Sequence, residues 1–458
     1  MSAPAMRVPA PSGESLEPRG LERAQHFALS AFRSGAGAIT LAAPRARDVS
    51  VLWDEASDAL VWHPAGGPAL AGLGIVRSST EGAEGVRADV LGLDARDVIE
   101  PAVVAPPLAA FGGLAFSPET ASAEPWASFG RALFVLPRWS YGLGPSGAWL
   151  RYVVGEHASE DELLTGLRTL WTRLSNDEAP RPAPSVVDRD DADEAAWDAH
   201  VRGITDAIAR GEAVKVVAAL STRLRLASTA SPVAVLQALA RRFPGCTRFA
   251  LRVEGTTFLG ATPERLVEKS GTQLRTEALA GSAAVGEGES LRASAKDRHE
   301  HDVVVQAIAD ALAPFATRVT PGAPVLRELP NVVHLSTPIE ATLARPTHVL
   351  ELVRALHPTP AVGGVPRDAA RRWITEREPV LFGTDAPGAR GWYAAPFGAF
   401  DASGDGRFVV ALRSGVLRDD RAWAFAGCGV VAGSDPRAEH AEATMKLGAF
   451  LSALEGRA

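Results

Sequence analysis

Short apolar runs separated by glycine and proline are the feature that most constrains the fold of this chain. Between about residues 22 and 155 they include 38–41, 109–116 and 132–137. Such runs, bounded by turn-forming residues, are typical of β-strands joined by tight connections. Helical periodicity is confined to separate stretches, such as the leucines from Leu163 to Leu174. Because helices and strands do not alternate in regular βαβ units, the sequence predicts an α+β fold with mainly antiparallel sheet.

Two stretches poor in apolar residues divide the chain. Residues 1–21 are rich in Pro, Ser and Gly without periodicity, which predicts a disordered tail. Residues 176–195 are charged and proline-rich with little to bury, which is typical of a linker. We therefore expect one half of the fold over 22–175 and the other over 196–458.

The second half carries clearer patterns. An apolar stripe at helical spacing runs from Trp197 to Ile208 and stops near Gly211, a residue suited to ending a helix. The other predicted elements are strands over 213–220 and 222–226, a helix over 294–314 capped by Ser294, a hairpin of 408–413 with 422–425, and a last helix near Pro436 capped by Ser434 or Asp435.

Composition excludes several classes of protein. With 458 residues, 46% of them hydrophobic and 22% charged, the chain can bury a large core and is not globally disordered. It has 47 Lys+Arg against 54 Asp+Glu and no long basic run, which argues against nucleic acid as the main partner. Two cysteines, Cys246 and Cys428, make neither a disulfide framework nor a zinc site alone. Without a signal peptide or a stretch of 18 apolar residues, we expect a cytoplasmic protein with no membrane partner.

Two ionisable residues in apolar surroundings are candidates for acid–base chemistry. Lys215 stands inside Ala213-Val-Lys-Val-Val-Ala-Ala-Leu220, where desolvation of an inward-facing side chain would lower its pKa and provide a general base. The alternative is an edge-strand lysine that blocks aggregation. Glu264 lies where an apolar strand breaks into a turn, so a desolvated carboxylic acid there could stay protonated and act as an acid. Alternatively, Thr262-Pro263-Glu264 starts a helix.

Glu300 is a charged residue on an apolar helical stripe. It shares that stripe with Val304, Ala307 and Ala311. A carboxylate there is costly unless it is paired or bound to a metal, although a position at the end of the stripe could reach solvent.

The last predicted helix carries Glu439, Glu442 and Lys446 on one side. Two carboxylates on adjacent turns suit a hard cation such as Mg²⁺. An ordinary exposed ion pair between Glu442 and Lys446 is the alternative.

Glycine-containing stretches and an arginine could hold an anion. Backbone N–H groups at Ala280-Gly281-Ser282 and Gly427-Cys-Gly429 are available, but neither stretch has the spacing of a nucleotide-binding loop. Arg413 alternates off the apolar face of 408–412 and is either a carboxylate clamp or a strand-surface residue. The local chemistry of these residues alone thus indicates, at most, a soluble α+β protein that is a magnesium enzyme acting on an anionic substrate.

A series of motifs between about residues 200 and 450 resembles the chorismate-utilising enzymes, the family of isochorismate, salicylate, anthranilate and aminodeoxychorismate synthases. This resemblance implies the family's large antiparallel sheets wrapped by helices. The matching stretches are Lys215-Val-Val, Gly260-Ala-Thr-Pro-Glu-Arg265, Arg275-Thr-Glu-Ala-Leu-Ala-Gly-Ser282, Ser294-Ala-Lys-Asp-Arg-His-Glu-His-Asp302, His334-Leu-Ser-Thr-Pro338, His357-Pro-Thr-Pro-Ala361, Arg390-Gly-Trp-Tyr393, Ala411-Leu-Arg413 and Ala426-Gly-Cys-Gly-Val-Val-Ala-Gly-Ser-Asp-Pro436.

Within the family the chain is most similar to isochorismate synthases, and this likeness implies roles for the residues. Lys215 would activate water for attack at C2 of chorismate, and Glu264 would protonate the departing C4 hydroxyl. Glu300 and Glu442 would bind Mg²⁺, with Glu439 near the ion. The substrate-binding residues implied by the resemblance are Gly281, Ser282, His334, Thr359, Ala361, Arg413, Gly429 and Lys446.

Departures from the family's patterns favour one product. Ala280 stands where aminodeoxychorismate synthases carry a lysine nucleophile, and Ala361 stands where salicylate and anthranilate synthases tend to have threonine. Without that hydroxyl, the chain is expected to stop at isochorismate. Other departures bear on substrate positioning near the last helix: Leu220 for a common arginine, Cys428 for an alanine and His440 for a tryptophan.

The sequence therefore predicts a Mg²⁺-dependent isochorismate synthase of the menaquinone or siderophore type. The alternatives are a salicylate synthase, which also eliminates pyruvate, a catalytically silent chorismate-binding relative, and a carboxylate-rich scaffold without a small ligand. Because water is the nucleophile, no amidotransferase subunit is expected, and the resemblance implies a monomer.

Overall fold

The computed structural model describes residues 17–53, 57–81, 86, 89, 91–117, 124–176, 184–283, 285–329, 332–384 and 389–456. The helices within these ranges are α1 (Glu17–Arg33), α2 (Glu160–Asn176), α3 (Glu194–Ala209), α4 (Pro232–Arg242), α5 (Gly288–Ala293), α6 (Ala295–Leu312), α7 (Val349–Leu356), α8 (Arg367–Arg377) and α9 (Pro436–Leu454), with 3₁₀ turns at Val49–Leu52 and Pro379–Phe382.

The strands of the first half are β1 (Ala38–Ala42), β2 (Ala59–His63), β3 (Ala69–Ser79), β4 (Asp97–Ile99), β5 (Ala109–Leu114), β6 (Ala132–Gly144) and β7 (Gly147–Val153). The strands of the second half are β8 (Val186–Asp190), β9 (Lys215–Leu226), β10 (Thr247–Val253), β11 (Thr256–Thr262), β12 (Arg265–Ser270), β13 (Gln273–Ala283), β14 (Ala316–Pro321), β15 (Val325–Leu329), β16 (Val332–Leu343), β17 (Gly364–Val365), β18 (Pro396–Asp401), β19 (Gly406–Val410), β20 (Ser414–Arg418) and β21 (Arg421–Val431).

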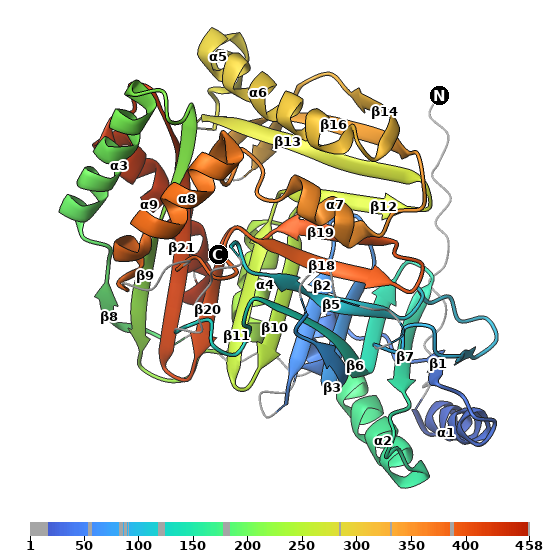
Figure 1. Ribbon diagram of the computed structural model, residues 1–458. Coiled ribbons are helices and arrows are strands. Elements are labelled where there is room, and N and C mark those ends of the chain that lie inside the picture. The colour runs from blue at the N-terminus through green and yellow to red at the C-terminus, as the bar shows by residue number, and fades with distance from the viewer. Residues whose placement is uncertain are drawn as a thin grey trace, which may run out of the picture.

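Strand β6 joins two long series of strands. One edge of β6 pairs with β3, and the series continues through β2, β10, β11, β20, β21 and β9, whose far edge holds β8 and β17. Its other edge pairs with β7 and with β5, from which a second series runs through β18, β19, β12, β13 and β16. In Figure 1, β9 and β21 lie on the left and β13 and β16 at the top. Apart from the parallel pair β1–β4, the strand pairs among the described residues are antiparallel, which confirms the predicted α+β class.

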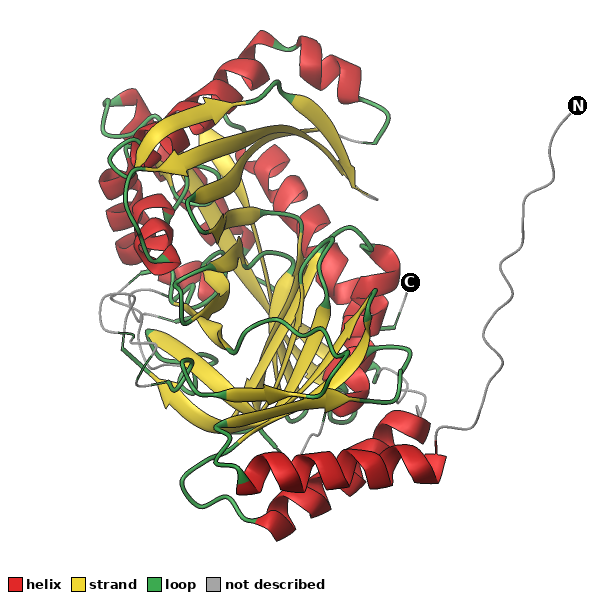
Figure 2. Cartoon of the chain, turned by 90° about the vertical axis from the view of Figure 1, so that its right-hand side faces the viewer, coloured by secondary structure: helices red, strands yellow, loops and turns green. Residues whose placement is uncertain are grey.

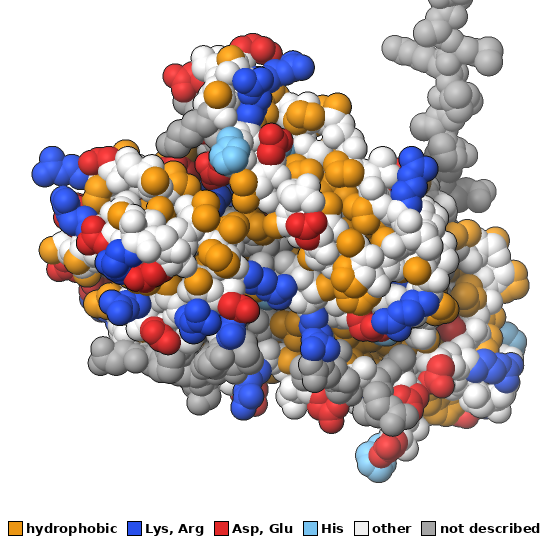
Figure 3. Space-filling model, turned by 45° about the horizontal axis from the view of Figure 1, so that its top comes forward, with side chains coloured by type: hydrophobic (Ala, Val, Ile, Leu, Met, Phe, Trp, Pro, Cys, Tyr) orange, Lys and Arg blue, Asp and Glu red, His pale blue; other side chains and the backbone are white. Residues whose placement is uncertain are grey.

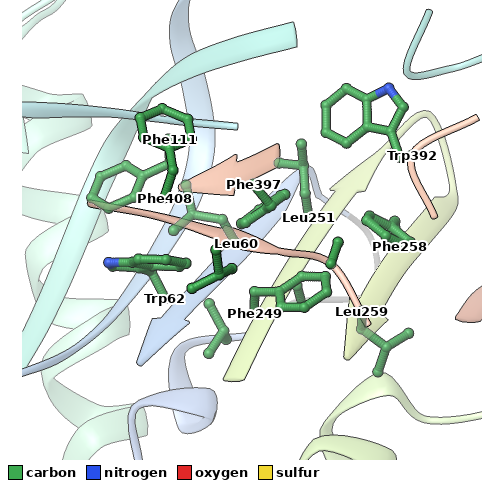
Figure 4. Close-up of a cluster of buried hydrophobic side chains, with 14 of the residues drawn as sticks. Leu60, Trp62, Phe111, Phe249, Leu251, Phe258, Leu259, Trp392, Phe397 and Phe408 are labelled. Carbon is green, nitrogen blue, oxygen red and sulfur yellow. The ribbon is translucent and has the colours of Figure 1, made fainter. Parts of the chain in front are cut away.

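The core lies between these two series of strands (Figure 4). Phe249 of β10 and Phe397 of β18 have ring centroids 4.8 Å apart, and Trp62 of β2 lies 6.0 Å from the same Phe397 ring. Aromatic side chains contribute large buried areas and favour such tilted pairs, so this cluster holds the two series face to face. Other buried members of the cluster are Leu60, Phe111, Leu251, Phe258, Leu259, Trp392 and Phe408.

Helices cover the outer faces of the strands. Helix α6 packs on β13, α9 on β21, and α7 on β12 and β19, while α1 and α2 lie side by side at the other end of the molecule (Figure 2). Ser294 caps α6 and Asp435 caps α9, as predicted, through side-chain oxygens that accept hydrogen bonds from backbone N–H groups.

In the part of the chain that the structure describes, no helix is long and apolar enough to cross a membrane. Figure 3 shows acidic and basic side chains interspersed over one face.

The boundaries of the predicted tail and linker need correction. Residues 1–16 lie outside the described part of the chain, but 17–21 already belong to α1, which packs against α2. Of the linker, 177–183 lie outside the described residues, whereas 186–190 form β8 and pair with β9. Residues 17–21 and 186–190 therefore belong to elements that pack or pair with segments distant in sequence, and local composition does not predict such contacts.

Two strand predictions also change. From Lys215 onward, the predicted runs 213–220 and 222–226 form one uninterrupted strand, β9, because β21 pairs along its edge as far as Arg225. The hairpin partner of β21 is β20, with Asp419 in the turn, whereas β19 pairs with β18 and β12. The chain leaves the direction of β19 at Arg413, whose φ of +49° places it in the left-handed region.

Candidate active site

The chain crosses from one series of strands to the other at two neighbouring places. The link from β11 to β12 contains Glu264, and the link from β19 to β20 contains Arg413. The links are tied together, since Val410 N–H donates to the Glu264 carbonyl at 3.1 Å and Ala261 N–H donates to the Arg413 carbonyl at 3.3 Å. The Arg413 guanidinium stacks 4.4 Å from the Phe243 ring, and desolvation is the main cause that lowers its pKa. Strand exchange thus fixes an acidic and a basic residue beside one another.

These crossings open into a cavity of about 240 Å³. Its lining includes all the predicted site residues except Thr359, which is buried two positions before Ala361 and whose hydroxyl has no hydrogen-bond partner in the described structure. The residues brought together are Lys215, Glu264, Gly281, Ser282, Glu300, His334, Ala361, Arg413, Gly429, Glu439, Glu442 and Lys446.

Lys215 is held inside the sheet and is paired. Val365 of β17 and Val431 of β21 flank it in register, so the edge-strand alternative is wrong. Its Nζ donates to Glu300 Oε1 at 2.5 Å, and the two side chains are 8% and 23% exposed. Helix α6 therefore places the partly buried Glu300 carboxylate against the Lys215 amine, which gives that carboxylate a hydrogen-bond partner.

Gly429 leaves the space that the Lys215 side chain occupies. A Cβ atom at Gly429 would lie 2.6 Å from Lys215 Cε and 3.0 Å from its Nζ. Real Cβ contacts are not this short, so any side chain here would displace the amine from Glu300.

We expect Gly429→Ala to impair turnover without unfolding the protein. Because the displaced atoms are the end of a flexible side chain, the melting temperature should change by only about 2 °C. The rate constant kcat should fall about tenfold or more, since Lys215 leaves its place. Gly448→Ala in α9, where an added Cβ meets nothing within 4 Å, is the matched control and should keep its kcat. Full activity of Gly429→Ala would show that the position of the amine is unimportant.

Glu264 is a buried carboxyl group in the cavity wall. It is 5% exposed, and desolvation, with a smaller contribution from the charge of Glu277, raises its pKa to about 8. The side chain is therefore protonated at neutral pH. The alternative of a helix start is wrong, because Arg265 begins β12.

Helix α9 presents Glu439, Glu442 and Lys446 to the cavity. Lys446 Nζ donates to Glu442 Oε1 at 2.6 Å and to the Gly427 carbonyl at 3.3 Å. The ordinary ion pair thus exists, and it also forms part of the cavity wall. The Glu442 side chain of this pair is 35% exposed, so its carboxylate is accessible to a cation.

The opposite wall contains an irregular stretch of β13. A register shift lies between Ala280 and Ser282, and Gly281 has a φ of +76°, a conformation that glycine adopts without strain. His334 of β16 lies beside it, with Nδ1 3.0 Å from Ser282 Oγ. Desolvation lowers the pKa of His334 to about 3, so a neutral imidazole lines this wall at pH 7.

A family model described as chorismate binding enzyme matches residues 51–455. The chain belongs to the chorismate-binding enzyme family. The salicylate biosynthesis isochorismate synthase of Pseudomonas aeruginosa is 40% identical over 374 residues, which cover 77% of this chain and 76% of that protein. An isochorismate synthase of Bacillus subtilis is 34% identical over 364 residues, covering 76% and 74%.

The fold agrees with this membership. The solved structure of the menaquinone-specific isochorismate synthase from Escherichia coli superposes with a TM-score of 0.75 at 25% identity, covering 94% of this chain and 99% of that one. The family predicted from the motifs is confirmed.

The donors that line the cavity include carboxylates suited to a hard cation such as Mg²⁺. Among the residues that the structure describes, no three His, Cys, Asp or Glu side chains are grouped closely enough to hold a metal. Mg²⁺ commonly takes one or two carboxylates and keeps several waters. Accessible carboxylates at Glu300 and Glu442 therefore fit this ion, provided that water and substrate complete its coordination.

Three further polar side chains line the cavity without having been predicted as site residues: Asp297, Arg390 and Tyr393. Asp297 lies one turn before Glu300 on α6, so helical spacing alone could have placed the two on one side. Arg390 and Tyr393 belong to a stretch matched by resemblance, but nothing in their local sequence indicates that they reach the cavity.

Proposed function

We propose that this chain is an isochorismate synthase that converts chorismate to isochorismate with Mg²⁺. The observation that supports it best is the presence of an amine, Lys215, and an acid, Glu264, protonated at neutral pH, on one cavity of a chorismate-binding enzyme. Relatives named isochorismate synthase, similar over three quarters of their length, support the same reaction.

In this proposal Lys215 assists formation of the new C–O bond of the ring, and Glu264 assists cleavage of the old one. Lys215 takes a proton from the water that forms a bond at C2, and Glu264 gives its proton to the hydroxyl that leaves C4. A hydroxyl is gained and a hydroxyl is lost, so the reaction is an isomerisation and its balance needs no oxidant or reductant. The pKa of Glu264 near 8 lies close to the working pH, where a proton donor is most effective.

The substrate has two carboxylates, and the cavity offers two groups of partners. Arg413 and Lys446 supply positive charge, and the backbone near Gly281 and Gly429 supplies N–H donors. Glu300 and Glu442, with Glu439 nearby, would hold Mg²⁺, which would neutralise the charge of a substrate carboxylate. Ala361 presents only a methyl group, which favours release of isochorismate over pyruvate elimination.

Removing either proposed metal ligand should weaken Mg²⁺ binding. For Glu300→Gln and Glu442→Gln we expect the Mg²⁺ concentration at half-maximal activity to rise about 10- to 100-fold. Isothermal titration of Mg²⁺ in the presence of chorismate measures the same affinity without turnover. Glu455→Gln, in the C-terminal cap of α9 and outside the cavity lining, is the control. Unchanged metal dependence in both variants would remove these carboxylates from the site.

The function is tested by incubating the purified protein with chorismate and Mg²⁺, with an EDTA control, and separating the products chromatographically. Isochorismate formed only with metal supports the proposal. Salicylate together with pyruvate would mean that Ala361 does not prevent elimination. Binding of chorismate without any product would identify a silent relative. We further propose that the enzyme is a cytoplasmic monomer without an amidotransferase subunit, to be checked by its mass in solution.

A further inference from the structure

A fully buried ion pair, Glu378 with Arg390, reaches the wall of the cavity through Arg390 and has no role in the proposed reaction. Glu378 and Arg390 are each 1% exposed. Arg390 Nε donates to Glu378 Oε2 at 2.5 Å, and its Nη2 donates to Oε1 at 2.7 Å, so the pair is bidentate. Such geometry fixes both side chains more strictly than a single hydrogen bond does.

The remaining donors and acceptors of the pair reach two backbone segments of the cavity wall. Arg390 donates from Nη2 to the Val217 carbonyl and from Nη1 to the Val362 carbonyl, each at 2.8 Å. Glu378 Oε1 accepts the Ala219 N–H at 2.7 Å. Val217 and Ala219 follow Lys215 on β9, and Val362 directly follows Ala361.

The pair stands where β9 lacks a neighbouring strand. On this edge, β17 is in register only with Lys215 and Val216, and β8 pairs only from Arg223 onward. In the gap, side-chain atoms supply the donor for Val217 O and the acceptor for Ala219 N–H that a strand would otherwise provide. Buried backbone groups must be satisfied, and here an ion pair satisfies them.

We propose that Glu378 and Arg390 are positioning residues that hold the start of β9 and the loop of Ala361 at a fixed separation, and thereby keep the Lys215 amine in place for the reaction. This inference rests on the proposed function of Lys215. The guanidinium is essential because its planar fork serves Glu378, Val217 and Val362 together, whereas an ammonium on a flexible stem does not reproduce that geometry.

The test is Arg390→Lys, compared with the same substitution at another buried arginine. Arg151 is 3% exposed, bonds Asp97 at 2.9 Å and Thr40 Oγ1 at 2.7 Å, and does not line the cavity. Both variants should lose stability. At a temperature where both are folded, Arg390→Lys should lower kcat about 10- to 100-fold with KM changed less than about threefold, because misplacement of a reacting group affects the rate. Arg151→Lys should retain kcat.

Hydrogen–deuterium exchange gives a readout that does not depend on turnover. Peptides covering Lys215–Leu226 should exchange faster in Arg390→Lys than in the wild-type chain and Arg151→Lys. If Arg390→Lys does not fold, Glu378→Gln, which keeps an acceptor for Ala219 N–H, replaces it with the same expectations.

Retention of kcat in the Arg390 variant, or an equal loss in both arginine variants, would overturn the inference. A wild-type chain that forms no isochorismate would refute the proposed function instead. In that case the hydrogen–deuterium exchange of β9 alone tests the positioning role. Unchanged exchange in the Arg390 variant would overturn it.

Discussion

Lys215→Ala is expected to lower kcat for isochorismate formation by about 10²- to 10⁴-fold, the range that a positioned general base contributes. The substitution removes the amine that would accept the proton of the attacking water. It should leave the fold intact, since the Glu300 side chain left without its partner is 23% exposed and can be hydrated. The measurement is kcat at saturating chorismate and Mg²⁺, together with the melting temperature.

A second buried lysine provides the control for this loss. Lys269 is 6% exposed and its Nζ lies 2.5 Å from Asp405 Oδ1, but neither residue lines the cavity. Lys269→Ala therefore removes a comparable ion pair and should lower stability while kcat stays near the wild-type value. Full activity of Lys215→Ala, or an equal loss of kcat in both variants, would refute the assignment of Lys215 as base.

Glu264→Gln is expected to reduce kcat by a similar factor and to change the pH dependence. In the wild-type chain the carboxyl has a pKa of about 8, so its acid form, and with it kcat/KM, should decline as pH rises through 8. The amide has no proton to lose, so the residual activity should lack this alkaline decline. Glu268→Gln on β12, a more exposed carboxylate, is the control and should keep the wild-type profile. An unchanged alkaline limb in Glu264→Gln would show that another group causes it.

The same group makes stability depend on pH. The pKa of Glu264 is raised from 4.5 to about 8, so between these values the folded chain binds more protons than the unfolded chain. The free energy of unfolding contributed by this group is therefore fully present below pH 4.5 and is lost as pH rises through 8. Thermal unfolding at pH 5 and pH 9 should show that Glu264→Gln gains stability relative to the wild type at the higher pH. No change in this difference would contradict the raised pKa.

Local sequence patterns predicted those parts of the site that depend on one element. Helical spacing placed Glu300 on the buried side of α6, and Ser294 was recognised as its cap because capping depends on neighbouring residues. Whether Lys215 is central or at an edge depends on β21, about 200 residues later, and no local pattern contains that pairing. The hairpin prediction failed at Arg413, because nothing in Ala411-Leu-Arg413 indicates a left-handed backbone.

The resemblance to chorismate-utilising enzymes predicted that these residues, although distant in sequence, share a cavity. The spacing of residues along the chain did not predict this. The resemblance did not reveal why Glu264 stays protonated, which results from burial and from Glu277 on another strand. It included Arg390 in a matched motif, but it implied neither a role for that residue nor its pairing with Glu378. Their partners are backbone atoms of β9, so their importance lies in a gap between strands and not in any recognisable spacing.

Strand β6, where the two series of strands meet, has a consequence for how small this enzyme can be. The cavity takes all its described lining residues from Lys215 onward, so the first half contributes none of them. Yet β2 pairs with β10, and β5 pairs with β18, so this half provides the shared scaffold that holds the segments carrying Lys215 and Glu264 at a fixed separation. A fragment starting at α3 would contain each chemical group of the site. It would also expose the unpaired edges of β10, β18 and part of β9, together with one side of the aromatic cluster, and such surfaces associate with other copies. We therefore expect the whole curled sheet to be the minimal unit of activity, with the half that does not line the cavity as necessary as the half that does.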